Sequence, residues 1–266
     1  MIASLGMYNM PWLTESNDAV WDWLRDRLRA SGVRQVPGAL ETGMPLWDVW
    51  RSPDLLLAQT CGYPLLALGN SVQVVATPTY DLRGCEGPLY RSLLVVAERI
   101  PAEAIGELRG LRAAVNDWDS NSGMNAFRAV VAPHAGDGSF FAEVVTTGSH
   151  MLSLAALREG SADVAAIDCV SYGLAARHRP ELLRGTRVIG ETAAIPGLPL
   201  ITAAATPQDT VVALRRALRG LVANPDLAWH RAALGLTGFA MLPRDAYALV
   251  GVMEHTAGAL GYSRLT

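Results

Sequence analysis

The chain has 266 residues, half of them hydrophobic, and a formal net charge of −3 at pH 7, which predicts a soluble globular protein with one large core or two modest ones. All 22 cationic side chains are arginines scattered along the sequence, so nucleic acid is not expected as a partner. The absence of lysine excludes lysine Schiff-base and P-loop chemistry, so a bound anion must be held by backbone N–H groups, hydroxyls or arginine.

Short β-rich runs alternate with amphipathic helical stretches, which predicts an α/β protein. The first helix is expected over about residues 17–30, because Val20, Leu24 and Leu28 share one face and Ser31-Gly32 ends it. Strands are expected at residues 2–7, 55–59, 72–77, 92–97, 112–115, 143–146, 164–167, 187–190 and 200–204.

The tail reads as helices at 207–222, 227–234 and 245–260 with almost no strand between them. This grouping predicts two lobes: residues 1–94 plus 197–266 form lobe 1, and residues 95–196 form lobe 2. The chain is expected to cross between the lobes at the strand 90–97 and near Pro196-Gly197-Leu198-Pro199, where proline fixes an extended backbone; an ordinary surface loop is the alternative for the second crossing.

Two strand-to-helix connections are rich in small hydroxyl residues. The first reads DSNSG at 119–123, and the second reads TGSH at 147–150. The first N–H groups of a helix have no partner within the helix and favour negative charge, so such openings can bind an oxyanion. We expect ligand contacts from these loops, with plain helix caps as the alternative; the residues are Ser120, Asn121, Ser122, Gly123, Gly148, Ser149 and His150.

Further candidates follow other predicted strands. Asp168 ends the run DVAAI, at the strand end where α/β proteins place ligands, and capping the next helix is its alternative role. Thr60 and Tyr63 lie in the turn QTCGYP, and Tyr8 follows the first strand. His150 in a first helical turn is expected to be neutral. No motif of hydrolases, zinc proteases or dinucleotide-binding enzymes occurs.

Targeting and cysteine signals are weak. No apolar run reaches the roughly 18 to 20 residues of a membrane span, and the first residues lack the pattern of a secretion signal. The periplasm is expected if the chain is a mature form, and the cytoplasm if Met1 is the native start. Cys61, Cys85 and Cys169 lack metal-ligand spacing, so neither metal nor cofactor is expected. In an oxidising compartment Cys61 and Cys85 are able to pair, worth roughly 3 kcal/mol.

Taken together, four stretches resemble the phosphonate/phosphite-type solute-binding proteins of ABC importers. They are YRSLLVV at 90–96, LRGLRAAVND leading to DSNSGMNA, TTGSHMLSLAALREGSADVAAIDCVSY, and PGLPLITAA. The resemblance implies a two-lobed type II periplasmic-binding-protein fold with a mixed sheet in each lobe and two hinge strands. It also implies a monomer that closes on a phosphonate, phosphate or phosphite and delivers it to an ABC permease.

The same fold also carries enzymes and sensors, so a second class of function stays open. A cytoplasmic enzyme resembling chorismate dehydratase would use His150 and Asp168 as acid and base. A cytoplasmic sensor would report occupancy to a partner. A solute-binding protein without catalytic activity is the leading expectation.

Overall fold

The computed structural model describes residues 1–136 and 138–266, which form two compact units. Unit 1 comprises Met1–Asp81, Glu86–Pro88 and Pro196–Ala246. Unit 2 comprises Leu82–Cys85, Leu89–Ile195 and Tyr247–Thr266. Each unit contains its own five-stranded sheet with parallel and antiparallel neighbours, as the expected α/β architecture requires.

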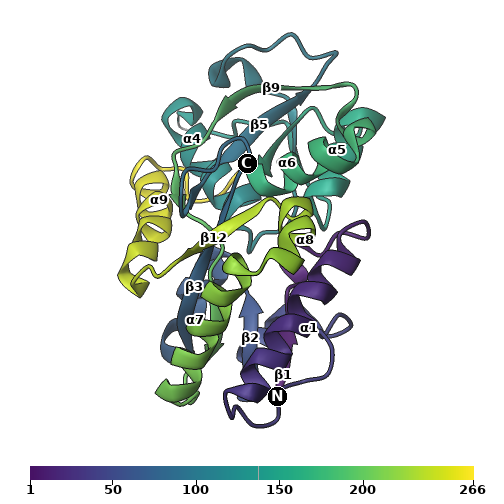
Figure 1. Ribbon diagram of the computed structural model, residues 1–266. Helices are drawn as coiled ribbons and strands as arrows, with labels where there is room; N and C mark the ends of the chain where they lie inside the picture. Colours follow the sequence, from purple (N-terminus) through teal and green to yellow (C-terminus); the bar gives the residue numbers. More distant parts are fainter. Residues whose placement is uncertain (137) are drawn as a thin grey trace. The chain divides into compact units, whose positions relative to one another are not determined.

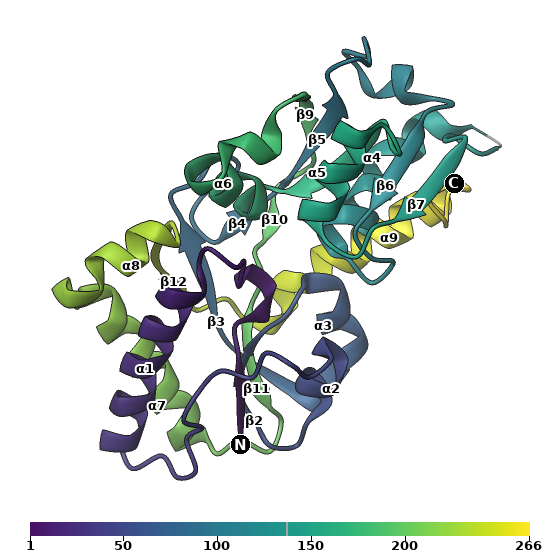
Figure 2. The ribbon, with the colours of Figure 1, turned by 90° about the vertical axis from the view of Figure 1, so that its right-hand side faces the viewer.

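The sheet of unit 1 has the strand order β1-β2-β11-β3-β12. Strand β2 is buried along its whole length, and β11 inserts antiparallel between β2 and β3. Helices α1 and α7, far apart in the sequence, pack side by side (Figure 1, Figure 2). The elements are β1 (Ile2–Ser4), η1 (Gly6–Tyr8), α1 (Thr14–Ala30), α2 (Leu46–Arg51), β2 (Leu55–Gln59), α3 (Gly62–Leu68), η2 (Gly69–Ser71), β3 (Val72–Tyr80), β11 (Leu200–Ala203), α7 (Gln208–Ala223), η6 (Pro225–Leu227), α8 (Ala228–Ala233), β12 (Leu236–Ala240) and η7 (Arg244–Tyr247).

The sheet of unit 2 has the order β7-β6-β8-β5-β9, with helices α4, α5 and α6 packed on it. Strands β5 and β8 are buried along their whole length. The elements are β4 (Leu89–Tyr90), β5 (Ser92–Ala97), η3 (Ile105–Leu108), β6 (Arg112–Val115), η4 (Asn121–Asn125), α4 (Ala126–Ala135), β7 (Glu143–Thr146), α5 (His150–Glu159), β8 (Val164–Asp168), α6 (Cys169–His178), η5 (Pro180–Leu183), β9 (Thr186–Glu191), β10 (Ile195–Pro196) and α9 (Ala248–Ala259).

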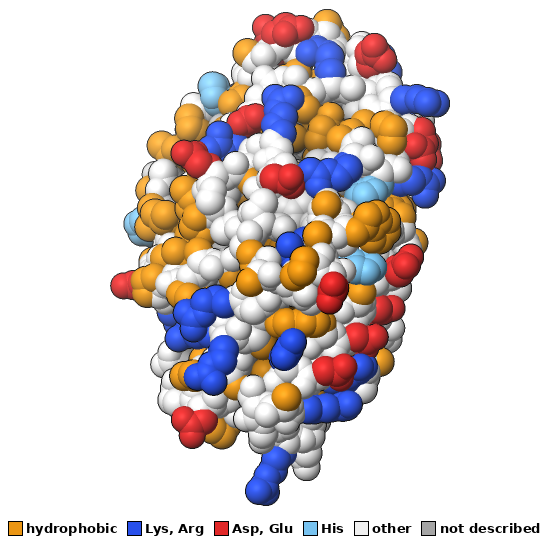
Figure 3. All heavy atoms as spheres, viewed as in Figure 1, with side chains coloured by type: hydrophobic (Ala, Val, Ile, Leu, Met, Phe, Trp, Pro, Cys, Tyr) orange, Lys and Arg blue, Asp and Glu red, His pale blue; other side chains and the backbone are white. Residues whose placement is uncertain are grey.

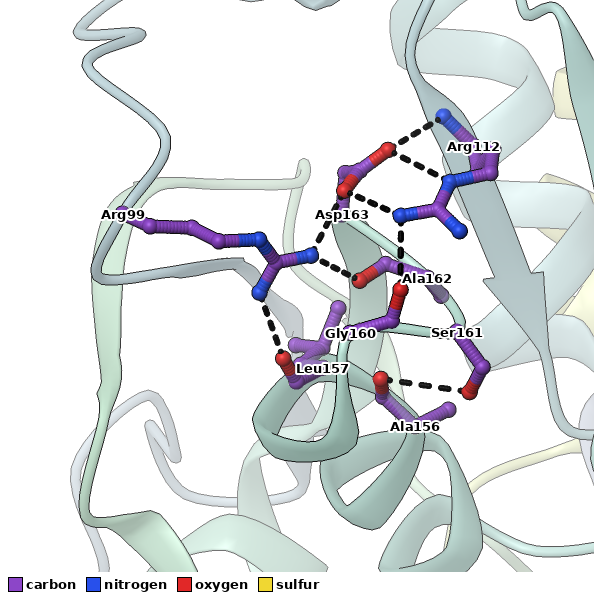
Figure 4. A network of polar contacts seen from close by, with 8 residues as sticks. All are labelled: Arg99, Arg112, Ala156, Leu157, Gly160, Ser161, Ala162 and Asp163. Atoms are coloured by element: carbon purple, nitrogen blue, oxygen red, sulfur yellow. Dashed lines mark hydrogen bonds and ion pairs between the residues drawn. The ribbon is translucent and has the colours of Figure 1, made fainter.

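A buried carboxylate aligns the parallel strands of unit 2 at their amino ends (Figure 4). Asp163, just before β8, accepts hydrogen bonds from the Arg112 backbone N–H at 3.0 Å and side-chain Nε at 3.0 Å, and from Arg99 Nη2 at 2.7 Å. Burial alone would raise the pKa of Asp163, but the hydrogen bonds and charges of Arg112 and Arg99 outweigh it and lower the pKa. The ionised Asp163 therefore ties the start of β6 to the start of β8.

The observed division of the chain differs from the expected one chiefly at the C-terminus. Residues 247–266 belong to unit 2, because α9 and the tail pack on α4. Asn125 Nδ2 donates to the Val250 carbonyl at 3.0 Å, and Arg128 Nη1 donates to the Ser263 carbonyl at 2.7 Å. These bonds join segments separated by more than a hundred residues, so helical periodicity along the sequence carries no sign of them.

The chain passes between the units at more points than the two expected, and one of them, after Ile195, coincides with the expected PGLP segment. The chain passes from one unit to the other after Asp81, Cys85, Pro88, Ile195 and Ala246. Short strands β4 and β10, which pair with each other, lie at two of these points. The PGLP segment begins at the second residue of β10, in keeping with the extended backbone that proline favours.

Charges of both signs are interspersed on the face of the protein in Figure 3. In the part of the chain that the structure describes, no helix is both long and apolar enough to cross a membrane. Among these residues there is also no cluster of three or more His, Cys, Asp and Glu side chains able to hold a metal ion.

Candidate functional site

The carboxyl ends of β6, β7 and β8 meet at one edge of the unit 2 sheet. Val115 at the end of β6 pairs with Thr146 at the end of β7, and β8 runs parallel to β6. Strand β5 runs the opposite way and places Ser92 opposite Asp168, the last residue of β8. Most of the predicted ligand residues follow these three strands, so they start from the same edge of the sheet.

The DSNSG connection folds into a capped helical opening. Ser120 is the cap: its Oγ accepts a hydrogen bond from the Gly123 N–H at 3.0 Å. The first turn, Asn121–Asn125, is a π-helix that continues into α4, and all five of its residues are buried. Of the two serines expected to cap this helix, Ser120 does so, which leaves the Ser122 hydroxyl for other contacts.

Gly123 lets two polar groups approach the helix opening closely. A Cβ at this position would lie 1.8 Å from Asn116 Oδ1 and 3.3 Å from His150 Cε1. Asn116 Oδ1 is buried and has no hydrogen-bond partner. A buried amide oxygen without a partner is costly in a folded protein and is frequently a sign of a binding site.

The TGSH connection is a second capped opening. Ser149 Oγ accepts from the Leu152 N–H at 3.2 Å, which makes Ser149 the cap and His150 the first residue of α5. The Gly148 N–H donates to the Asn116 carbonyl at 2.9 Å, so this loop is joined directly to the one after β6. Both loops therefore contain a helix cap, the alternative role that the sequence left open, and ligand contact from them stays a prediction.

The two openings meet through their side chains. Ser122 Oγ and His150 Nε2 are 2.9 Å apart, and Ser122 Oγ also lies 3.5 Å from Ser120 Oγ. His150 Nδ1 is buried without a hydrogen-bond partner, and the residue as a whole is half-buried. Burial lowers the pKa of His150 to about 4, so the ring is neutral at neutral pH, as its position in a first helical turn predicts.

This low pKa makes stability depend on pH. An unfolded histidine takes up its proton near pH 6.5, and folded His150 only near pH 4. Between these values the unfolded state binds more protons, so the contribution of the neutral ring is lost as pH falls from about 6.5 towards 4. We expect His150→Gln to remove about 2 kcal/mol of this pH dependence, measured by urea unfolding at about pH 7 and about pH 4.5.

The matched control for this measurement is His255→Gln, which changes an exposed histidine of α9. In this variant, the free energy of unfolding should change between the two pH values by as much as it does in the unsubstituted protein. An unchanged pH dependence in His150→Gln would contradict the assignment.

A chain of hydrogen-bonded, buried polar side chains holds the DSNSG connection in place at the start of α4. Tyr90 Oη accepts from Asn121 Nδ2 at 3.0 Å, Asn121 Oδ1 accepts from Asn125 Nδ2 at 3.0 Å, and Asn125 Oδ1 accepts from Arg128 Nη2 at 2.7 Å. Ser92 Oγ adds a bond to the Ser122 carbonyl at 2.8 Å. Asn121 was among the predicted ligand residues, whereas Tyr90, Ser92, Asn125 and Arg128 were not predicted. The available signal was the run of buried polar residues in the segment 121–128.

Asp168 lies in the third strand-to-helix connection at this edge, between β8 and α6. Its side chain is 1% exposed, and Oδ1 accepts from the Ser171 N–H at 2.9 Å, so it caps α6. Capping, the alternative role that the sequence left open for Asp168, therefore occurs. A ligand contact of Asp168 stays a prediction.

Three predicted ligand residues lie in unit 1. Thr60 follows β2, is fully buried, and donates its N–H to the Pro199 carbonyl at 3.0 Å. Tyr63 lies half-buried in the first turn of α3. Tyr8 is buried at the end of η1, with its ring 5.8 Å from the ring of Tyr80 in an edge-on arrangement. The structure therefore divides the predicted set between the two units.

The pairing of Cys61 with Cys85, which the sequence left open for an oxidising compartment, is not formed in the structure. None of the three cysteines is in a disulfide bond, and the sulfur next to Cys85 is that of Cys169. Cys61 belongs to unit 1, and both Cys85 and Cys169 belong to unit 2. The sequence interval between Cys61 and Cys85 suggested a loop closure, but the chain enters a different unit between these residues.

Three comparisons relate this chain to known proteins. A family model described as the periplasmic phosphonate substrate-binding protein of ABC transporters matches residues 52–247. Comparison of the sequence with curated proteins finds no significant match. Solved structures of similar fold are numerous.

The binding-protein component of an ABC phosphonate transporter from Pseudomonas aeruginosa has a TM-score of 0.75 and 19% identity, over 91% of this chain and 82% of that one. PhnD1 from Prochlorococcus marinus in complex with methylphosphonate has a TM-score of 0.75 and 12% identity, over 97% of both chains. A Xanthomonas citri protein bound to chloride has a TM-score of 0.74 and 16% identity, over 98% of both. At these identities the likeness establishes the fold.

The family match covers most of the chain and spans both units, and it includes all three connections at the unit 2 sheet edge. The solved structures agree with the two-lobed type II binding-protein fold that the sequence motifs suggested. The chain therefore belongs to the family of phosphonate-type periplasmic substrate-binding proteins of ABC transporters.

Proposed function

We propose that this protein captures a small phosphorus oxyanion, a phosphonate, phosphate or phosphite, and presents it to an ABC permease. The observation that carries the proposal is the contact between Ser122 Oγ and His150 Nε2 at 2.9 Å. It brings two helix openings to one point, where both helix dipoles favour negative charge. With no lysine in the chain, hydroxyl and backbone donors of this kind are what an oxyanion would meet.

Within unit 2, the proposed contacts divide into donors and acceptors. The donors are the hydroxyls of Ser120, Ser122 and Ser149, the amide of Asn121 and the ring of His150. Gly123 and Gly148 would let the ligand come close to the backbone, and their own N–H groups are bonded to Ser120 Oγ and to the Asn116 carbonyl. Asp168 and the unpartnered Asn116 Oδ1 are acceptors. An acceptor beside anion donors favours a ligand that also carries a proton or an amine, such as a hydrogen phosphonate or an aminoalkylphosphonate.

Unit 1 is proposed to complete the site by hinge closure. Thr60 and Tyr63 would add hydroxyl donors, and Tyr8 would add an aromatic wall, as in the sequence-based expectation. Family membership supports this proposal, because the matched segment spans both units. Closure would exclude water and so strengthen each charge-assisted hydrogen bond.

We further infer that the protein holds its ligand without converting it. His150 and Asp168 are the acid and base candidates for an enzyme on this fold. A histidine with a pKa of about 4 is a poor match for proton transfer near pH 7, and Asp168 Oδ1 is engaged in capping α6. Both observations support binding over catalysis.

The test is a thermal-shift and calorimetric titration with phosphate, phosphite, methylphosphonate, 2-aminoethylphosphonate, sulfate and small carboxylates. A true ligand should stabilise the protein by about 2.7 kcal/mol at a hundredfold excess over the dissociation constant. Ser122→Val should remove this shift, because it deletes a hydroxyl and fills the space before α4. Ser161→Val, at an exposed serine beyond the C-terminal end of α5, should retain it.

Two results would contradict the proposal. Stabilisation by carboxylates and by none of the phosphorus anions would exclude the ligand class. A full shift in Ser122→Val, in a protein whose circular dichroism is unchanged, would show that this serine is structural.

A further inference from the structure

Two thiols of unit 2 lie in contact. Cys85 Sγ is 3.5 Å from Cys169 Sγ, although the two residues are 84 positions apart in the sequence. Cys169 is buried as the first residue of α6, and Cys85 is half-buried in the turn at 82–85. We propose that Cys85 and Cys169 form a disulfide bond under oxidising conditions, which ties this turn to α6.

Two glycines allow the turn at 82–85 to pack closely on α6. Gly84 has a φ of +90°, and a Cβ there would lie 2.7 Å from the Cβ of Cys169. Leu82 packs over Gly173 of α6, where a Cβ would lie 3.0 Å from that of Leu82. Any larger residue at position 84 or 173 would push the turn away from the helix, so this packing is what brings the sulfur atoms together.

Backbone hydrogen bonds hold both cysteines in place. The Cys85 N–H donates to the Leu82 carbonyl at 3.0 Å, and the Cys169 N–H donates to the Arg91 carbonyl at 3.1 Å. Because the sulfur atoms already lie 3.5 Å apart, bond formation needs them to approach by about 1.5 Å more. The third thiol, Cys61, belongs to unit 1 and provides an internal control.

The environment of the two thiols assigns their order of reaction. The hydrogen bond with Cys85 and burial raise the pKa of Cys169 far above its usual range. Its thiol is therefore protonated and does not react first with an external oxidant. Cys85, which is half-buried, is the thiol that meets an external oxidant. The oxidant is a second disulfide, such as oxidised glutathione or a disulfide-bearing thiol oxidase of an oxidising compartment.

The exchange balances in two steps. The Cys85 thiolate attacks one sulfur of the oxidant, forms a mixed disulfide and releases one thiol. Cys169 then loses its proton and attacks Cys85 Sγ, which breaks the mixed bond and releases the second thiol. Two S–H bonds are lost, one S–S bond is gained, and the oxidant disulfide is reduced to two thiols.

The bond would affect stability in a measurable way. It closes a loop whose ends are 84 residues apart, and long closed loops gain most from a crosslink. We expect the melting temperature of the oxidised protein to exceed that of the reduced protein by roughly 5–15 °C. In Cys85→Ser, reductant should leave the melting temperature unchanged.

The decisive experiment counts free thiols. The full chain is incubated with oxidised glutathione, denatured in N-ethylmaleimide, and analysed by intact mass and by mapping with an arginine-specific protease. Of the three cysteines, only Cys61 should be alkylated, and one peptide pair should contain Cys85 joined to Cys169. The Cys61→Ser variant should form the same bridge.

Alkylation of all three cysteines after oxidation would overturn the proposal, and so would a bridge that contains Cys61. Neither outcome depends on ligand binding, so failure here is distinguishable from failure of the proposed function. The thiol count on the unsubstituted protein also stands if a cysteine variant folds poorly.

Discussion

Gly123→Ala is expected to weaken oxyanion binding by at least ~100-fold and to lower the stability of the protein by about 1–3 kcal/mol. The added Cβ would lie 1.8 Å from Asn116 Oδ1 and 2.9 Å from Asn116 Cγ, well inside contact distance. Either the Asn116 side chain must move or the π-turn of η4 must shift. Both movements disturb the N–H groups and hydroxyls that the ligand is proposed to use.

The two effects of Gly123→Ala are measured separately, by calorimetric titration with the anion that binds best and by urea unfolding without ligand. The control is Gly258→Ala in α9, where a Cβ meets nothing within 4 Å and alanine is a better helix former. Its affinity should be unchanged, and its stability unchanged or slightly higher. Full affinity in Gly123→Ala would exclude the opening of η4 as the anion site.

Arg128→Met is expected to cost about 3 kcal/mol of stability. The Arg128 side chain is 5% exposed; its Nη1 donates to the Ser263 carbonyl at 2.7 Å and its Nη2 to Asn125 Oδ1 at 2.7 Å. Methionine fills similar space but donates nothing, so two acceptors lose a charged donor. The loss should also loosen the C-terminal segment from α4, which hydrogen exchange at residues 250–266 would detect.

Arg216→Met is the matched control, because Arg216 lies on the exposed face of α7. Its effect should stay within about 0.5 kcal/mol. A similarly small effect of Arg128→Met would contradict the view that this arginine joins the C-terminal segment to unit 2.

Local patterns predicted most of the secondary structure. The strands at 55–59, 92–97, 112–115 and 143–146 occur with the expected bounds, because short runs rich in apolar residues and bounded by turn residues are typical of strands. Strand β12 was missed, since LTGFA is short, contains glycine and lies among helices. Its strand character comes from pairing with β3, which is a tertiary effect.

The candidate site was predictable where it depends on helix capping. Ser120 and Ser149 cap their helices because a hydroxyl before an apolar run is a local signal. The contact between Ser122 and His150, the unpartnered oxygen of Asn116 and the neighbouring sulfurs of Cys85 and Cys169 were not predictable. Each brings together residues from distant segments, and such proximity depends on the register of the sheet.

The strand order of unit 1 has a consequence for how the chain becomes folded during synthesis. Strand β11 lies between β2 and β3, yet it is made only after nearly all of unit 2. Until the ribosome has released residues 200–203, β2 and β3 have no common partner and each carries an open edge. Unit 1 therefore cannot complete its sheet from its own N-terminal segment, and the open edges of β2 and β3 are available for edge-to-edge pairing until β11 has been made.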